Sequence, residues 1–304
     1  MPFSLDKLLV IGISSRALFD LEAEEELFRR QGLEAYRQHQ IAHENEVLPM
    51  GGGFPLVKAL LKLNELTHNQ RLAEVVIMSR NSSETSLRIF NSIRHYGLDI
   101  TRAALSGGAS IAPYLQAFNV SLFLSMHEED VQAAVDSGTA AALLYQKPEN
   151  ALAELDQIRI AFDGDAVIFS DESERIYQSQ GIEAFERHER ENAEKPLPEG
   201  PFARLLKALS YIQKNASANG RPPIRTALVT ARSSPAHERV IRTLRAWDVA
   251  IDETFFMGGV AKSNVLAAFK PHIFFDDQPG HCEPASPLVQ TGRVPLKTIN
   301  TEKV

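Results

Sequence analysis

The sequence is poor in three features, and each shortage excludes a class of protein. It has one cysteine, Cys282, so no disulfide forms within the chain, as is usual in a reducing compartment. Its 32 Lys and Arg are outnumbered by 39 Asp and Glu, and the net charge of -7 argues against nucleic-acid polymers and anionic membranes as partners. No apolar run approaches the roughly 20 residues that span a bilayer, and the first residues lack a signal-peptide pattern. We therefore expect a cytoplasmic protein.

The composition is that of an ordinary globular protein with a sizeable core. Of the 304 residues, 44% are hydrophobic and 23% are charged. That length is about twice a typical single domain, so one large domain or two modest ones are both allowed.

The chain repeats itself. Gln31–Tyr36 recurs as Gln180–Phe185, 149 positions later, and further along Gly107-Gly108 falls on Gly258-Gly259 at an offset of 151. Matches in one order at nearly one offset, over about 120 residues, are hard to produce by chance. We predict two halves on one plan, residues 1–149 and 150–304.

Each half alternates short apolar runs with segments of helical length, which predicts an α/β fold with a parallel sheet. The expected strands of the first half are 8–13, 75–78, 103–105 and 120–124, and those of the second are 158–162, 226–229, 254–257, 272–275 and one near 294. A long charged stretch, 20–72 or 171–222, follows the first strand of each half. We expect each stretch to form a helical, cap-like insertion. Gly51–Gly53 in the first stretch is interpreted as a flexible connection.

Polar side chains follow the strands of the second half, where α/β sheets bind their ligands. They are Asp163, Gly164 and Asp165 after the first strand, Thr230, Ala231 and Arg232 after the second, Lys262 after the third, and Asp276 and Asp277 after the fourth. Each group alone is a weak indication of a functional site, because Asp-x-Asp is usually a turn or a helix cap and a single lysine is usually solvated. Together, in this order and all at strand ends, they indicate one site.

The chemistry of this set is metal-assisted phosphoryl transfer. Clustered carboxylates stay ionised together only beside a cation, and all-oxygen ligation suits Mg²⁺, with Asp276 and Asp277 completing its site. Asp163 is the candidate nucleophile on phosphorus, and Asp165 is the candidate general acid and base. The Gly164 N–H and the Thr230 hydroxyl are candidate phosphate donors, as are Ala231 and Arg232, and Lys262 would neutralise the phosphoryl charge.

This order of motifs resembles the haloacid dehalogenase superfamily of phosphatases. Three segments, 13–20, 43–46 and 162–172, narrow the resemblance to the cytosolic 5′-nucleotidase I family, over nearly the whole chain. The resemblance implies two haloacid-dehalogenase-like, Rossmann-like halves and hydrolysis of nucleoside 5′-monophosphates, AMP foremost, through an aspartyl-phosphate. It also implies that Mg²⁺ is held by Asp163, Asp276, Asp277 and the backbone carbonyl of Asp165.

The first half lacks these groups, so we predict a catalytically dead copy. At the repeat offsets, Asp163, Asp165, Thr230, Lys262, Asp276 and Asp277 fall on Ser14, Arg16, Ser79, Ile111, Ser125 and Met126. A structural role, forming a wall of the other half's pocket, is favoured for it. The alternative is nucleotide binding without chemistry, for which the candidate contacts are Ser14, Arg16, Ser79, Arg80 and Asn81.

Two other functions stay open at this point. One is a phosphatase of the same mechanism for another small ester, such as a sugar phosphate. The other is an inactive, nucleotide-binding regulatory protein, which the intact catalytic set argues against. Homo-oligomerisation is left open.

Overall fold

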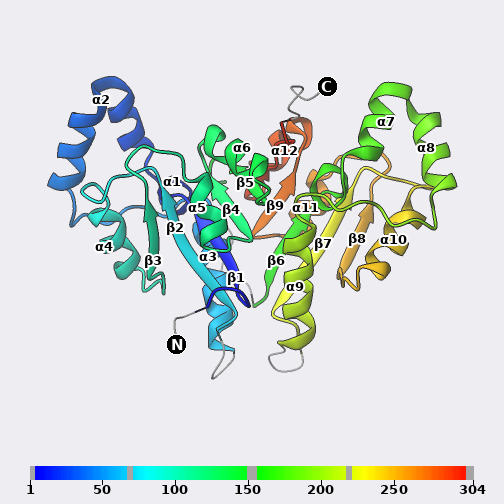
Figure 1. The fold of residues 1–304 in the computed structure, drawn as a ribbon, viewed down its shortest axis with the longest axis horizontal. Helices are drawn as coiled ribbons and strands as arrows, with labels where there is room; N and C mark the ends of the chain where they lie inside the picture. The colour runs from blue at the N-terminus through cyan, green and yellow to red at the C-terminus, as the bar shows by residue number, and fades with distance from the viewer. Residues whose placement is uncertain (1–3, 67–70, 149–155, 217–220, 299–304) are drawn as a thin grey trace. The chain divides into compact units, whose positions relative to one another are not determined.

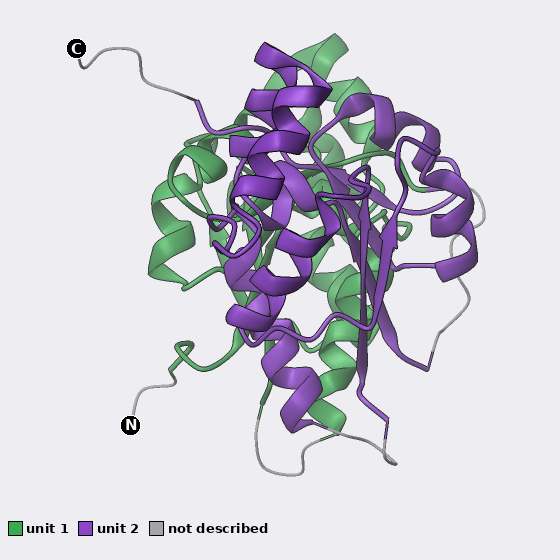
Figure 2. Cartoon of the chain, turned by 90° about the vertical axis from the view of Figure 1, so that its right-hand side faces the viewer, with its two compact units in different colours: residues 1–147 green, residues 148–304 purple. Residues whose placement is uncertain are grey.

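The computed structural model describes residues 4–66, 71–148, 156–216 and 221–298. The chain divides into two compact units, residues 1–147 and 148–304 (Figure 2). The predicted boundary, between residues 149 and 150, lies outside the described residues. Each unit is an α/β structure whose described strands pair in parallel, so the predicted α/β class is confirmed.

Unit 1 holds a parallel sheet in the order β3-β2-β1-β4-β5 (Figure 1). Its strands are β1 (Leu9–Ile13), β2 (Ala73–Ser79), β3 (Arg102–Leu105), β4 (Leu122–Ser125) and β5 (Ala141–Leu144). Its helices are α1 (Ser15–Leu18), α2 (Glu22–Ala42), α3 (Phe54–Lys62), α4 (Leu87–His95), α5 (Ala112–Ala117) and α6 (Glu128–Asp136), with a 3-10 turn at Leu63–Glu65. β1, β2 and β4 are buried along their whole length, which explains their continuous apolar runs.

Unit 2 repeats this strand order as β8-β7-β6-β9-β10, again in parallel. Its strands are β6 (Ile158–Phe162), β7 (Ile224–Thr230), β8 (Glu253–Phe256), β9 (Ile273–Asp276) and β10 (Thr291–Arg293). A π turn, η2 (Gly164–Ile168), follows β6, and the helices are α7 (Glu172–Gln180), α8 (Ile182–Glu191), α9 (Ala203–Asn215), α10 (His237–Ala246), α11 (Ser263–Phe269) and α12 (Pro279–Ala285). Every predicted strand in both halves overlaps or directly adjoins an observed one, and β5 is an additional strand.

The insertion predicted over 171–222 contains α7, α8 and α9 among its described residues. α7 and α8, which we call the cap helices, meet at Gly181, whose φ of 80° suits glycine. Figure 1 shows them beyond the end of the sheet. α9 instead packs against β7 and belongs to the layer that covers the sheet. The buried apolar residues of α9 account for this packing, whereas α7 and α8 are mostly polar.

Gly51–Gly53 is a packed loop, so its interpretation as a flexible connection was wrong. The backbone N–H groups of Gly51 and Gly53 donate to the carbonyl oxygens of Leu18 and Ala17, at 2.9 and 2.8 Å. A Cβ atom on Gly51 would lie 2.9 Å from the backbone of residues 17–19. Glycine is needed here for close backbone approach rather than for mobility.

A buried histidine at the start of β9 makes the stability of the protein dependent on pH. Its ring Nδ1 accepts the backbone N–H of Arg159 at 3.0 Å, and burial lowers the pKa of His272 to about 4. Between pH 6.5 and pH 4, His272 is therefore protonated in the unfolded chain but stays neutral in the folded chain. We expect this difference to lower the free energy of unfolding by up to about 3 kcal/mol as the pH falls from 6.5 to 4.

The repeat supplies the matched variant for this prediction. Ser121 is the counterpart of His272, because the two backbone N–H groups donate to Val10 and Arg159, the matching residues of β1 and β6. We expect His272→Ser to lose less stability than the wild type between pH 7 and pH 4.5, measured by urea unfolding. Equal losses in the two proteins would contradict the prediction, since all other titrating groups are shared.

Candidate active site

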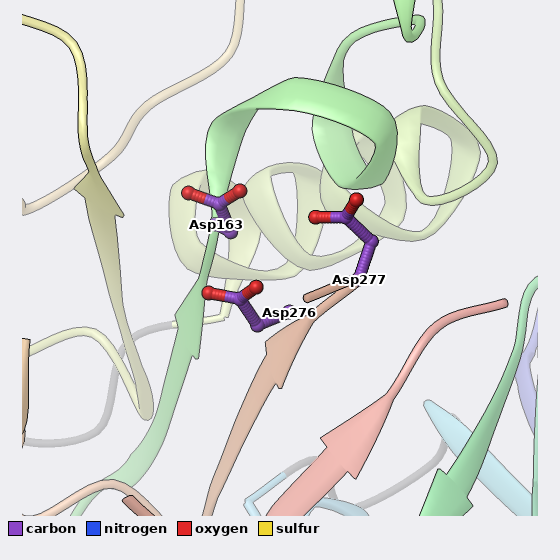
Figure 3. Close-up of side chains that lie close together, drawn as sticks. All are labelled: Asp163, Asp276 and Asp277. Carbon is purple, nitrogen blue, oxygen red and sulfur yellow. The ribbon is translucent and has the colours of Figure 1, made fainter. Parts of the chain in front are cut away.

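The strand ends of unit 2 bring the predicted acidic residues and the lysine together. Asp163 follows β6, Asp276 ends β9, and the two carboxylates face the same space as Asp277 (Figure 3). The ammonium group of Lys262, at the start of α11, donates to Asp163 Oδ1 and to Asp276 Oδ2, at 2.7 Å each. Below them the rings of Phe162 and Phe275 stack with centroids 5.7 Å apart, which fixes the ends of both strands.

The turn after β6 positions Gly164 and Asp165. Its backbone leaves helical geometry at Asp165 and at Ala166, whose φ is 60°, and it closes with a hydrogen bond from Phe169 N to Gly164 O at 2.9 Å. A Cβ atom on Gly164 would lie 3.2 Å from the hydroxyl of Thr230, so this position is tight for any larger residue. The turn thus places the Thr230 hydroxyl beside the start of the Asp-x-Asp motif.

The three carboxylates carry more negative charge than Lys262 balances. Burial raises the pKa of Asp163 against the lowering effect of Lys262, and burial, then Asp163 and Asp276, raise the pKa of Asp277 to about 8. Burial also opposes ionisation of Asp276, but His281 and Lys262 outweigh it and lower the pKa of that carboxyl. The same carboxylates overcome the effect of burial on Lys262 and raise its pKa, so the amine stays protonated.

The donor set fits a small divalent cation. Asp163, Asp276 and Asp277 each offer an oxygen within 4.8 Å of the others, and no second such group of His, Cys, Asp or Glu occurs among the described residues. Asp277 Oδ1 is buried and has no hydrogen-bond partner. A cation bound here would interact with this oxygen and would favour the ionised forms of the carboxyl groups whose pKa is raised. Hard carboxylate oxygens are also the ligands that Mg²⁺ prefers.

The side chain of Arg232 contacts carboxylates. Its Nε and Nη2 donate to the two oxygens of Asp165, at 2.8 and 2.6 Å, and its Nη1 donates to Glu189 on α8. Its predicted contact with phosphate stays a prediction. Sequence reasoning missed Glu189, because its segment is rich in charged residues and carries no motif that sets this glutamate apart.

The five residues proposed to contact a nucleotide in unit 1 make contacts within that unit, and nucleotide binding by them stays a prediction. Ser14 caps α1, the Ser79 hydroxyl lies 3.1 Å from that of Ser15, and Arg80 pairs with Asp130 at 2.7 Å. The backbone N–H of Asn81 donates to the Ser79 hydroxyl, and Arg16 pairs with Glu25 at 3.2 Å.

Arg16 alone of the five lines the cavity of about 240 Å³ that unit 1 contains. Asp20 and Glu22 also line this cavity, so its wall carries charges of both signs.

Comparison with known proteins places the chain in a family. The sequence profile described as 5′-nucleotidase matches residues 1–301. The chain belongs to the 5′-nucleotidase family. It is 38% identical over 289 residues to human cytosolic 5′-nucleotidase 1B. The aligned region covers 92% of this chain and 47% of the relative. The chain thus spans about half the length of this curated relative.

The family assignment confirms the resemblance found in the sequence. No solved structure matches the chain. Among the described residues, no helix is both long and apolar enough to cross a membrane.

Proposed function

We propose that this member of the 5′-nucleotidase family hydrolyses nucleoside 5′-monophosphates, AMP foremost, to nucleoside and phosphate, in the cytosol and with Mg²⁺. The observation that carries the proposal is the position of Lys262 between Asp163 and Asp276. Beside them lies Asp277, whose buried Oδ1 has no hydrogen-bond partner. An acidic cluster with a fixed ammonium group suits a phosphate that arrives with a divalent cation. The family and the cytosolic relative support the same substrate class.

The first chemical step is the attack of Asp163 on phosphorus. A carboxylate oxygen forms a bond to phosphorus, the ester bond to the 5′ oxygen breaks, and Asp165 gives its proton to that leaving oxygen. Lys262 neutralises charge on the phosphoryl oxygens, while the Thr230 hydroxyl and the backbone N–H groups of Gly164 and Ala231 donate to them. The nucleoside then leaves.

The second step returns the enzyme to its starting state. Asp165, now ionised, takes a proton from water, and the water oxygen attacks the phosphorus of the aspartyl-phosphate. The bond to Asp163 breaks and inorganic phosphate is released. When bound by Asp163, Asp276, Asp277 and the carbonyl of Asp165, Mg²⁺ supplies charge neutralisation at the phosphoryl group.

Phosphate release from a panel of monophosphates tests this function. We expect release from AMP or another nucleoside 5′-monophosphate with Mg²⁺, and none with EDTA. Release from sugar phosphates alone would keep the mechanism and replace the substrate. Absence of release from every ester would favour the inactive regulatory protein.

We also propose that unit 1 is a duplicated, haloacid-dehalogenase-like unit without chemistry of its own. The serines and arginines once considered for a nucleotide are hydrogen-bonded or ion-paired within the unit, which supports a structural role. We expect Arg16→Ala to leave kcat/KM for AMP within about twofold of the wild type, because Arg16 meets Glu25 rather than a free anion site.

Steady-state assays with and without added nucleoside di- and triphosphates check this prediction. Asp20→Asn is a matched control, since Asp20 lines the same cavity with the opposite charge. A nucleotide response that disappears only in Arg16→Ala would show that unit 1 binds a nucleotide through this residue.

A further inference from the structure

A buried glutamate on the cap connects the cap helices to the catalytic turn. Glu189 on α8 is 1% exposed, and the Ser173 hydroxyl on α7 donates to its Oε1 at 2.7 Å. Arg239 on α10 donates to the same oxygen at 3.0 Å, and Arg232 donates to Oε2. A buried carboxylate needs such compensation, and two arginines from the core supply it.

Arg232 extends this network to the residue assigned as general acid and base. Its other donors form a two-pronged contact with both oxygens of Asp165, and its side chain is 2% exposed. The ring of Phe185 on α8 lies 5.4 Å from the guanidinium carbon and helps to keep water from it. Charges alternate along the row Arg239, Glu189, Arg232 and Asp165, so each group holds the next in place.

Unit 1 shows what anchoring alone requires. Arg88, the counterpart of Arg239 at the offset of 151, is buried and pairs with Glu24 on α2 at 2.7 Å. One ion pair therefore joins that helix to α4.

The counterparts of Asp165, Arg232 and Glu189 are Arg16, Asn81 and Gln40. The anchoring arginine is thus present in both units, whereas the row that reaches the Asp-x-Asp motif is present only where the catalytic carboxylates are. If the row served only to fasten the cap helices, we would expect unit 1 to keep it even though its catalytic carboxylates are absent.

We propose that Glu189 is a positioning residue that acts through Arg232 to hold the Asp165 carboxyl group in its working orientation, and so couples the cap helices to the acid and base of the reaction. The proposal rests on the function proposed above. An arginine fork fixes both oxygens of a carboxylate, but only while the fork itself is fixed. Glu189 fixes it by binding the remaining terminal nitrogen.

The test is a double-mutant cycle with Glu189→Gln and Asp165→Asn. Using the ester that the wild type hydrolyses fastest, we expect Glu189→Gln to lower kcat by about 10-fold or more while KM stays within about threefold. In the Asp165→Asn background the same change should lower kcat by less than about twofold, because the group that it positions is gone. Single-turnover phosphate release measures the slow variants.

Two further variants separate positioning from folding. Glu24→Gln breaks the matching ion pair of unit 1 and should lower the unfolding temperature with kcat within about twofold of the wild type. Glu189→Asp keeps the charge but withdraws the carboxylate by one methylene, and it should lower kcat even if Glu189→Gln fails to fold.

Each result decides between the proposals. Equal loss of kcat in both backgrounds, or an unchanged kcat in folded Glu189→Gln and Glu189→Asp, would overturn the positioning role and leave the proposed function intact. A wild type that hydrolyses no ester would overturn both.

Discussion

Asp163→Asn is expected to abolish phosphate release while the protein stays folded. An amide does not attack phosphorus, and loss of a nucleophile lowers kcat by about 10⁴-fold or more. The fold should survive, because burial already disfavours the ionised form of this side chain, as its raised pKa indicates, and Asp276 still pairs with Lys262. Phosphate release and thermal unfolding, measured on the same preparation, check both parts.

Ser14→Ala is the matched control, because Ser14 occupies the place of Asp163 in unit 1. It removes the side-chain cap of α1, where Ser14 Oγ accepts the N–H of Ala17 at 3.3 Å. We expect a loss of about 1 kcal/mol in stability and a kcat/KM within about twofold of the wild type. An Asp163→Asn variant that retains more than about one hundredth of the activity would remove Asp163 from the role of nucleophile.

Most strands were predictable because burial on both faces of a parallel sheet leaves a readable apolar run, as in β1, β2, β4 and β9. β5 was missed, since Ala141–Leu144 contains only alanine and leucine, which favour helices as readily as strands. The sequence did not distinguish the cap helices from α9 for a related reason. The charged cap helices and the amphipathic α9 share a helical pattern, and only tertiary contact shows that α9 lies on the sheet.

The acidic cluster was predictable because its members are tied to strand ends, whose relative positions the sheet fixes. Asp163 and Asp276 follow neighbouring strands, β6 and β9, and so meet at one edge. Glu189 has no such tie. It lies on a helix outside the sheet, 43 positions from Arg232, among other charged residues, and nothing in one sequence distinguishes a buried glutamate there from its solvated neighbours.

The same limit applies to the assigned role of Arg232. Its place directly after Thr230 suggested a phosphate contact, but strand-end position fixes only where the backbone lies. The direction of the long side chain depends on Asp165 and Glu189, which reach it from other elements. Backbone placement was thus predictable where side-chain pairing was not.

Asp277→Asn is expected to separate metal binding from folding. In the wild type, Mg²⁺ at about 100 times its Kd should add about 2.7 kcal/mol of stability and raise the unfolding temperature by several degrees. The increase should be larger at pH 8.5 than at pH 6.5, because the raised pKa of Asp277, about 8, means that the cation displaces a proton at the lower pH. EDTA should remove both the increase and the phosphate release.

The variant should lack the Mg²⁺-dependent increase and the activity, yet be more stable than the metal-free wild type at pH 8.5. Burial and the charges of Asp163 and Asp276 oppose ionisation of Asp277, and an amide avoids that penalty. Asp130→Asn, which changes another buried aspartate, should lose stability because it weakens the ion pair with Arg80, but it should keep the increase with Mg²⁺. If the metal-free Asp277→Asn protein unfolds at a lower temperature than the metal-free wild type, this carboxylate stabilises the fold and is not primarily a metal ligand.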